Sequence, residues 1–149
     1  MALALPPDFK EFLSLLESHG VEYLLIGGYA VGFYGYPRAT GDMDIWISQN
    51  VENARRMVAV LQAFGFSGND LSEELFLVER GMVRLGMPPL RLEIITHISG
   101  VSFKDCYPRR TLLTVDDLTI PLINMDDLKA NKKASGRAKD LDDLQHLPE

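Results

Sequence analysis

Several residue types that often reveal a function are scarce in this sequence. Cys106 is the one cysteine among 149 residues, so we expect no internal disulfide and no thiolate metal site. The histidines His19, His97 and His146 lie far apart and lack the spacing of a zinc site. No apolar run approaches the ~20 residues of a membrane span, and the first residues show no signal-peptide pattern. We therefore expect a soluble, cytoplasmic protein that does not contact membranes.

An excess of positive charge is also absent. The formal net charge of −6 at pH 7 gives no overall attraction for nucleic acid, although a local basic patch could still form. Apolar residues make up 46% of the chain, which is long enough for one compact core and short for two. We find no internal repeat, low-complexity tract or linker in the sequence. These features predict one domain over residues 1–149.

Hydrophobic periodicity predicts alternating helices and strands. Helical spacing covers residues 5–20, 29–35, 51–65 and 124–147. Strand patterns cover residues 21–28, 42–47, 81–86, 90–98, 112–115 and 118–123. Asn50 and Asn124 are suitable N-caps, and Gly136 is expected to break or bend the last helix. The expected apolar stripe of the third helix consists of Val51, Ala54, Met57, Val58 and Leu61.

Two aspartates interrupt an otherwise apolar strand. Asp42 and Asp44 lie in the run DMDIWI, and their i, i+2 spacing places both side chains on one face. Carboxylates side by side repel each other, so one takes up a proton unless a cation lies between them. Mg²⁺ or Mn²⁺ suits such oxygen ligands, and Mg²⁺ usually shares its coordination shell with substrate phosphates. The pair therefore indicates a metal site; a solvent-facing strand surface is the alternative.

A glycine pair precedes these aspartates. Gly27 and Gly28 follow a buried strand and begin a short helix. Glycines at such a turn let backbone N–H groups approach a phosphate closely, beside a helix N-terminus that favours negative charge. Together with the aspartates they predict a site for a metal–nucleoside triphosphate. A tight turn without a ligand is the alternative, and the pattern G-G-x-x-x-G differs from the dinucleotide-binding G-x-G-x-x-G.

Glu93 is the candidate for a third acidic group. It alternates with Leu92 and Ile94, so it faces away from them in an otherwise apolar strand. A lone charge there is either a device that protects a sheet edge or a functional group.

A basic cluster lies near the C-terminus. It consists of Lys129, Lys132, Lys133, Arg137 and Lys139. A solvated helical face paired with Asp140 and Asp143 would explain it, and so would one or two side chains that reach a phosphate. We expect Lys133 and Lys139 to remain in solvent.

These motifs resemble those of the DNA polymerase β-type nucleotidyltransferase superfamily. The likeness covers residues 21–147 and includes GG, RATGDMDIWI, the later strand carboxylate and NKKASGRAKDLDDL. It is greatest to minimal bacterial members related to the abortive-infection nucleotidyltransferase toxins. The resemblance implies an α/β (α+β) fold in which helices flank a mixed β-sheet. It also implies metal-dependent transfer of a nucleoside monophosphate from an NTP to an acceptor hydroxyl, with release of pyrophosphate.

The resemblance assigns roles to individual residues. The catalytic, metal-binding carboxylates would be Asp42, Asp44 and Glu93, with Mg²⁺ or Mn²⁺ as the cofactor. The nucleotide would be held by Gly27, Gly28, Arg38, Thr40, Lys132 and Arg137. Many members have Gly-Ser where this chain has Gly27 and Gly28, the third carboxylate is commonly Asp, and a large accessory domain that would indicate the acceptor is absent.

Two readings of the function therefore remain open. The first is a nucleotidyltransferase whose acceptor is an RNA, a protein or a small molecule. The second is a non-catalytic nucleotide-binding module, or one component of a toxin–antitoxin pair with a cognate partner.

Overall fold

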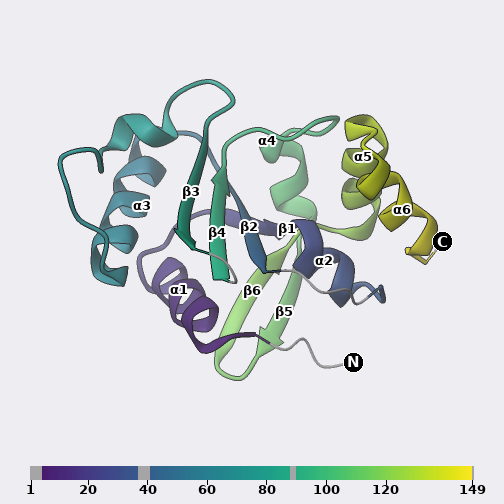
Figure 1. Cartoon of the computed structure of the whole chain (residues 1–149), viewed down its shortest axis with the longest axis horizontal. Helices are drawn as coiled ribbons and strands as arrows, with labels where there is room; N and C mark the ends of the chain where they lie inside the picture. The colour runs from purple at the N-terminus through teal and green to yellow at the C-terminus, as the bar shows by residue number, and fades with distance from the viewer. Residues whose placement is uncertain (1–4, 37–40, 88–89, 149) are drawn as a thin grey trace.

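The computed structural model describes residues 5–36, 41–87 and 90–148, in which six strands form one mixed β-sheet (Figure 1). The strands are β1 Tyr23–Ile26, β2 Asp42–Ile47, β3 Met82–Met87, β4 Leu90–Ile95, β5 Thr111–Val115 and β6 Leu118–Leu122. Their spatial order is β3-β4-β2-β1-β6-β5. β2 runs parallel to β4 and β1 parallel to β6, whereas the other neighbours are antiparallel.

Helices cover both sides of this sheet. The α-helices are α1 Pro7–Ser18, α2 Gly27–Phe33, α3 Val51–Phe64, α4 Phe103–Cys106, α5 Met125–Ser135 and α6 Ala138–His146, and the 3₁₀ turns are η1 Glu73–Phe76 and η2 Tyr107–Arg109. Figure 1 shows α1 and α3 together on one side of the sheet, with α5 and α6 at the opposite side. This arrangement confirms the predicted mixed β-sheet flanked by helices.

Local signals in the sequence explain where the long helices begin and end. The side chain of Asn50 accepts a hydrogen bond from the N–H of Asn53 at 2.8 Å, and that of Asn124 accepts one from Asp127 at 2.7 Å. Gly136 has a left-handed φ of +68° and ends α5, so α6 begins in a new direction. The predicted N-caps and the predicted break at Gly136 are therefore confirmed.

The buried stripe of α3 differs from the expected one. Val51 is 55% exposed and Val58 is only partly buried, whereas Val60 is fully buried. In the first turn the inward position belongs to Asn53, whose side chain bonds to the backbone of Glu22 and Ser48 at 2.7–3.0 Å. Because this polar anchor fixes the rotation of the helix, Val51 at its first position points to solvent.

Two short elements were not predicted from the sequence, and one connection between strands cannot be compared. The short helix α4 and the following turn η2 lie where no regular structure was expected. The hairpin of β3 and β4 is present, with Met87 opposite Leu90, but Pro88 and Pro89 lie outside the described residues. Within the described part of the chain, none of the helices combines the length and apolar character needed to cross a bilayer.

Candidate active site

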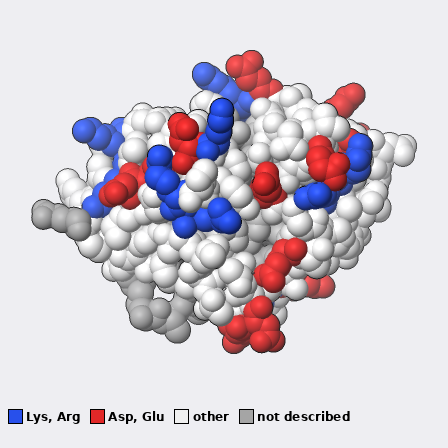
Figure 2. All heavy atoms as spheres, turned by 180° about the vertical axis from the view of Figure 1, so that it is seen from behind, with Lys and Arg blue, Asp and Glu red and all other residues white. Residues whose placement is uncertain are grey.

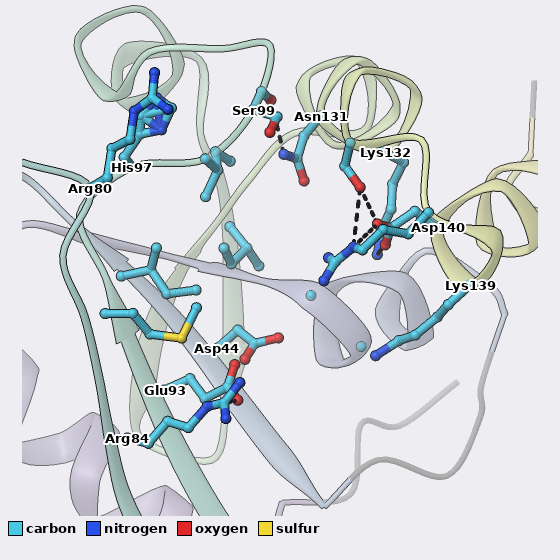
Figure 3. A pocket seen from close by; sticks show the side chains of 18 residues that line it. Asp44, Arg80, Arg84, Glu93, His97, Ser99, Asn131, Lys132, Lys139 and Asp140 are labelled. Carbon is cyan, nitrogen blue, oxygen red and sulfur yellow. Dashed lines mark hydrogen bonds and ion pairs between the residues drawn. The ribbon is translucent and has the colours of Figure 1, made fainter.

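The parallel pairing of β2 with β4 brings two predicted site residues together. In this register Asp44 lies directly beside Glu93, and both side chains line a pocket of about 460 Å³. Gly27 and Gly28, at the start of α2, line the same pocket. Figure 3 shows the carboxyl groups of Asp44 and Glu93 pointing toward each other. The two acidic residues thus share one site with the glycine pair.

Asp44 is the more strongly perturbed of these two groups. Burial, together with the hydrogen bond and charge of Glu93, raises the pKa of Asp44 from 3.8 to about 7. The Oδ1 atom of Asp44 is buried and has no hydrogen-bond partner within the described residues. A cation beside this carboxyl group would stabilise its charged form.

Asp42 faces a different partner. Arg91 binds it with two hydrogen bonds, from Nε to Oδ1 at 3.2 Å and from Nη2 to Oδ2 at 3.1 Å. Asp42 shares a strand face with Asp44 but is not among the residues that line the pocket. Among the residues that the structure describes, no three His, Cys, Asp or Glu side chains are grouped to hold a metal ion. The structure therefore brings together two of the three predicted carboxylates and pairs the third with an arginine.

Gly27 is required by the close approach of α2 to Asp44. Its φ is +70°, a conformation that residues with a side chain rarely adopt. A Cβ atom at this position would overlap the Oδ2 atom of Asp44. The first glycine of the pair therefore lets the start of α2 pass directly over the carboxylate.

We expect Gly27→Ala to be destabilising in a way that depends on Asp44. Left-handed φ alone should cost about 1–2 kcal/mol, and the overlap with Asp44 adds to that cost. In an Asp44→Ala background the overlaps with Oδ2 and Cγ disappear and only the Cβ of residue 44, at 3.0 Å, remains close, so the same substitution should cost clearly less. Urea denaturation of the four proteins measures this coupling. Equal losses of unfolding free energy in both backgrounds would contradict the close approach of Gly27 to the Asp44 carboxylate.

Basic side chains form much of the remaining pocket wall. They are Arg80, Arg84, Lys132, Arg137 and Lys139. Arg84, which lies opposite Glu93 on β3, binds it with 3.0 Å between Nε and Oε1. This local concentration of cations contrasts with the net charge of −6 for the chain. On the face seen in Figure 2, basic side chains are interspersed with acidic ones and form no unbroken basic surface.

Lys132 is buried in this wall and already has partners. Its side chain is 6% exposed, and its Nζ lies 2.9 Å from Asp140 and 3.0 Å from Asp143. Arg137 also binds Asp140, with 2.7 Å between Nε and Oδ2. Burial alone would raise the pKa of Asp140, but hydrogen bonds from Ser135, Lys132 and Arg137 lower it to about 2. Lys132 thus joins α5 to α6 and positions the side of the pocket that carries Arg137.

Lys139 lies closer to the site than expected. Both Lys133 and Lys139 are predicted to remain in solvent, and both are exposed. Lys139 nevertheless lines the pocket, and its charge acts to lower the pKa of Asp44 (Figure 3). The helical spacing could not reveal this, because the turn at Gly136 redirects the chain between α5 and α6. Arg38 and Thr40 lie outside the described residues.

Two arginines of the pocket were missed from the sequence. Pairing the predicted strands 81–86 and 90–98 outward from their connection would place Arg84 opposite Leu92, whereas the observed register, with Met87 opposite Leu90, places it opposite Glu93. Arg80 precedes β3 and has a positive φ of 56°, and no sequence pattern assigned it a role.

Several solved structures have a similar fold. A candidate nucleotidyltransferase from Thermotoga maritima aligns with a TM-score of 0.62 and 15% identity, over 92% of this chain and 88% of that one. The lincosamide antibiotic adenylyltransferase LnuA, in its lincomycin-bound form, aligns with a TM-score of 0.60 and 15% identity, over 97% of each chain. The chain has a nucleotidyltransferase fold.

A third similar structure extends this likeness. It is an antigenic nucleotidyltransferase-like protein from Paracoccidioides brasiliensis, with a TM-score of 0.53 and 19% identity over 93% of this chain and 73% of that one. No protein-family model and no curated protein matches the sequence. At such identities the likeness establishes the nucleotidyltransferase fold, and none of these three proteins is described as an abortive-infection protein.

Proposed function

We propose that this protein is a metal-dependent nucleotidyltransferase. It would transfer a nucleoside monophosphate from an NTP to an acceptor hydroxyl and release pyrophosphate. The observation that carries this proposal is the Asp44–Glu93 pair at the bottom of a pocket with five basic residues. The pocket volume of about 460 Å³ lies within the range of small-molecule sites, which is about 300–1,000 Å³.

Mg²⁺ or Mn²⁺ would be held by Asp44 and Glu93. The donor set fits this ion, because a buried carboxylate oxygen of Asp44 has no partner among the described residues and a second carboxyl group lies beside it. Proteins commonly bind Mg²⁺ through one or two carboxylates together with substrate phosphates. Asp42 would join them only after exchanging its bonds to Arg91. When bound, the ion would neutralise charge on the phosphates and on the attacking oxygen.

The side chains of the pocket would have separate roles in proton transfer, phosphate binding and the positioning of helices. Glu93 would accept the proton of the attacking hydroxyl, since it lies on the pocket wall beside Asp44. Arg84, Arg137 and Lys139 would bind the triphosphate and stabilise the departing pyrophosphate. Lys132 would hold α5 and α6 in place through Asp140 and Asp143. Catalysis would therefore rest on positioning and charge neutralisation.

Metal removal tests the proposed activity directly. We expect labelled nucleotide to pass from an NTP to a component of a cell lysate when Mg²⁺ is present, and no transfer when EDTA is added. The four NTPs, each labelled on the α-phosphate, would be compared in parallel. Transfer that persists in EDTA would contradict metal dependence, and NTP binding without any transfer would contradict the enzyme.

The ion pairs of the site favour a second candidate function, that of a nucleotide-binding module. Arg91 and Arg84 each occupy a carboxylate that the resemblance assigns to the metal. A nucleotide-binding module without turnover could keep these pairs permanently, and the abortive-infection resemblance would then point to a toxin–antitoxin component with a cognate protein partner. Mg²⁺-dependent binding of NTP without label transfer would support this candidate.

Lys139 and Lys133 offer a matched test of phosphate binding. Charged hydrogen bonds contribute about 1.5–3 kcal/mol, and the exposure of Lys139 to solvent places its contribution at the lower end. We therefore expect Lys139→Ala to weaken Mg²⁺–NTP binding roughly tenfold, while Lys133→Ala changes it little. Calorimetric titration of both variants measures the difference. Equal effects would show that the cluster is only a solvated helical face.

A further inference from the structure

A smaller pocket adjoins the candidate active site. Its volume is about 240 Å³, and its walls include Trp46, Glu79, Val101 and Phe103. We call it the Trp46 pocket. It shares the residues Arg80, His97 and Ile98 with the larger pocket, so the two are contiguous. A molecule in the Trp46 pocket would therefore lie next to a nucleotide bound beside Asp44.

The strand geometry places this second pocket within reach of the carboxylate pair. Trp46 is the next residue after Asp44 on the same face of β2, which corresponds to about 7 Å along the strand. Ile95 holds the equivalent position after Glu93 on β4 and lines the larger pocket. A hydroxyl group that points from the Trp46 pocket toward Asp44 thus has a short path to the reacting phosphate.

The indole of Trp46 supplies an independent reason to expect a ligand. Its Nε1 atom is buried and has no hydrogen-bond partner within the described residues. Buried tryptophan N–H groups usually have such a partner, and an orphaned one is costly. The Oδ1 atom of Asp44 is orphaned in the same way. Successive residues on one strand face thus carry unsatisfied polar atoms, and each residue lines one of the two adjoining pockets.

We propose that the Trp46 pocket binds the acceptor, and that the acceptor is a small, uncharged, polyhydroxylated ring. This inference rests on the proposed nucleotidyl transfer. Phe103, which packs edge-on against Trp46 with centroids 5.2 Å apart, offers an apolar surface for the C–H groups of such a ring. Glu79, Arg80 and His97 on the pocket wall offer hydrogen-bonding groups to the hydroxyls of the ring.

Size and charge favour a ring over a polymer. Pockets for drug-sized ligands measure about 300–1,000 Å³, so one of about 240 Å³ suits a single ring. Glu79 on its wall offsets the charge of Arg80, and the net charge of −6 for the chain disfavours a phosphodiester chain. The face in Figure 2 likewise shows no unbroken basic surface along which RNA could lie.

The reaction at this junction balances without a further reagent. The ring hydroxyl oxygen attacks the α-phosphorus of the NTP and forms a new O–P bond. The bond from the α-phosphorus to the oxygen that bridges it to the β-phosphorus breaks, and its electron pair leaves with pyrophosphate. The hydroxyl proton passes to the carboxylate of Glu93.

Trp46 provides the measurement, because it is the one tryptophan of the chain. We would titrate the protein with myo-inositol and with methyl α-D-glucopyranoside and record tryptophan fluorescence. A short single-stranded RNA and a peptide with Ser, Thr and Tyr serve as comparison probes. We expect a saturable change with at least one ring compound and none with the RNA or the peptide.

Two variants test whether that signal comes from this pocket. Val101→Phe fills the pocket and should weaken binding of the ring compound roughly tenfold or more. Val51→Phe, at an exposed position of α3 outside the pocket lining, is the matched control and should leave binding unchanged. If Val101→Phe does not fold, Glu79→Ala at an exposed turn position should weaken binding at least threefold on the same rough scale.

The outcomes separate this inference from the proposed function. No saturable response to either ring compound, or a response that both pocket variants leave unchanged, would overturn the acceptor site. Transfer of label to RNA or protein in a lysate, unaffected by Val101→Phe, would overturn it while the nucleotidyltransferase stands. Ring binding in a protein that binds none of the four Mg²⁺–NTPs would overturn both the transferase and the acceptor role.

Discussion

Asp44→Asn is expected to raise the free energy of unfolding of the metal-free protein at pH 8 while abolishing nucleotidyl transfer. Burial and Glu93 raise the pKa of Asp44 from 3.8 to about 7 in the folded protein. Between these values the folded state holds a proton that the unfolded state has lost, so stability falls as pH rises. Above pH 7, Asp44 is charged in the folded protein as well, and burying this charge lowers the free energy of unfolding by its full amount. Substitution by asparagine removes the charge and therefore this cost.

The size of this effect follows from the displacement of the pKa. Each unit corresponds to about 1.4 kcal/mol, so the variant should gain on the order of 2–4 kcal/mol at pH 8 and little near pH 4. Urea denaturation with EDTA at both pH values measures the gain, with Asp70→Asn at an exposed loop position as the control. Added Mg²⁺ should stabilise the original protein and not the variant. A less stable Asp44→Asn protein at pH 8 would instead identify Asp44 as a structural, hydrogen-bonded residue.

Lys132→Met is expected to cost about 3–5 kcal/mol of unfolding free energy, the usual effect of removing one member of a buried ion pair. Methionine preserves most of the packing volume, so the loss isolates the ammonium group. Without it, Asp140 and Asp143, which are 2% and 1% exposed, lose their shared cation. Of these two carboxylates, Asp140 keeps Arg137 and Ser135 as partners.

Lys133→Met is the matched control, because Lys133 is the neighbouring residue and is exposed. It should change stability by no more than about 0.5 kcal/mol. Adding Asp143→Asn to Lys132→Met should recover part of the loss, since the added change removes a buried charge. A loss below about 1 kcal/mol for Lys132→Met would show that the ammonium group does not anchor α6.

The elements of this fold follow from local signals that the sequence displays. Strand alternation around Asp44, the caps at Asn50 and Asn124, and the glycine at position 136 act over a few residues, and each is found as expected. The partner of each charged side chain does not follow from such signals. Arg91 meets Asp42 because β2 and β4 pair in parallel across a long connection, and periodicity does not specify their register.

The same distinction, between local signals and contacts across elements, explains why the roles of the lysines in the basic cluster were not predicted. Helical spacing predicts that Lys129, Lys132 or Lys133, and Arg137 lie along one side. It does not show that α6 folds back to place Asp140 and Asp143 against Lys132. Lys139 reaches the pocket for the same reason. Contacts between neighbouring elements, set by one turn, thus decided which lysine is buried and which faces the candidate site.

The two sides of the larger pocket are synthesised at different times. Asp44 and Glu93 belong to strands, and all strands of the described sheet precede α5 in the chain. Lys132, Arg137 and Lys139 come with α5 and α6, the last described elements. A chain that has left the ribosome as far as β6 therefore presents the carboxylate pair without these three bases. Under the proposed function, Arg137 and Lys139 should add to the affinity for nucleotide only after the C-terminal helices fold back onto the sheet, whereas Arg84 on β3 is already in place.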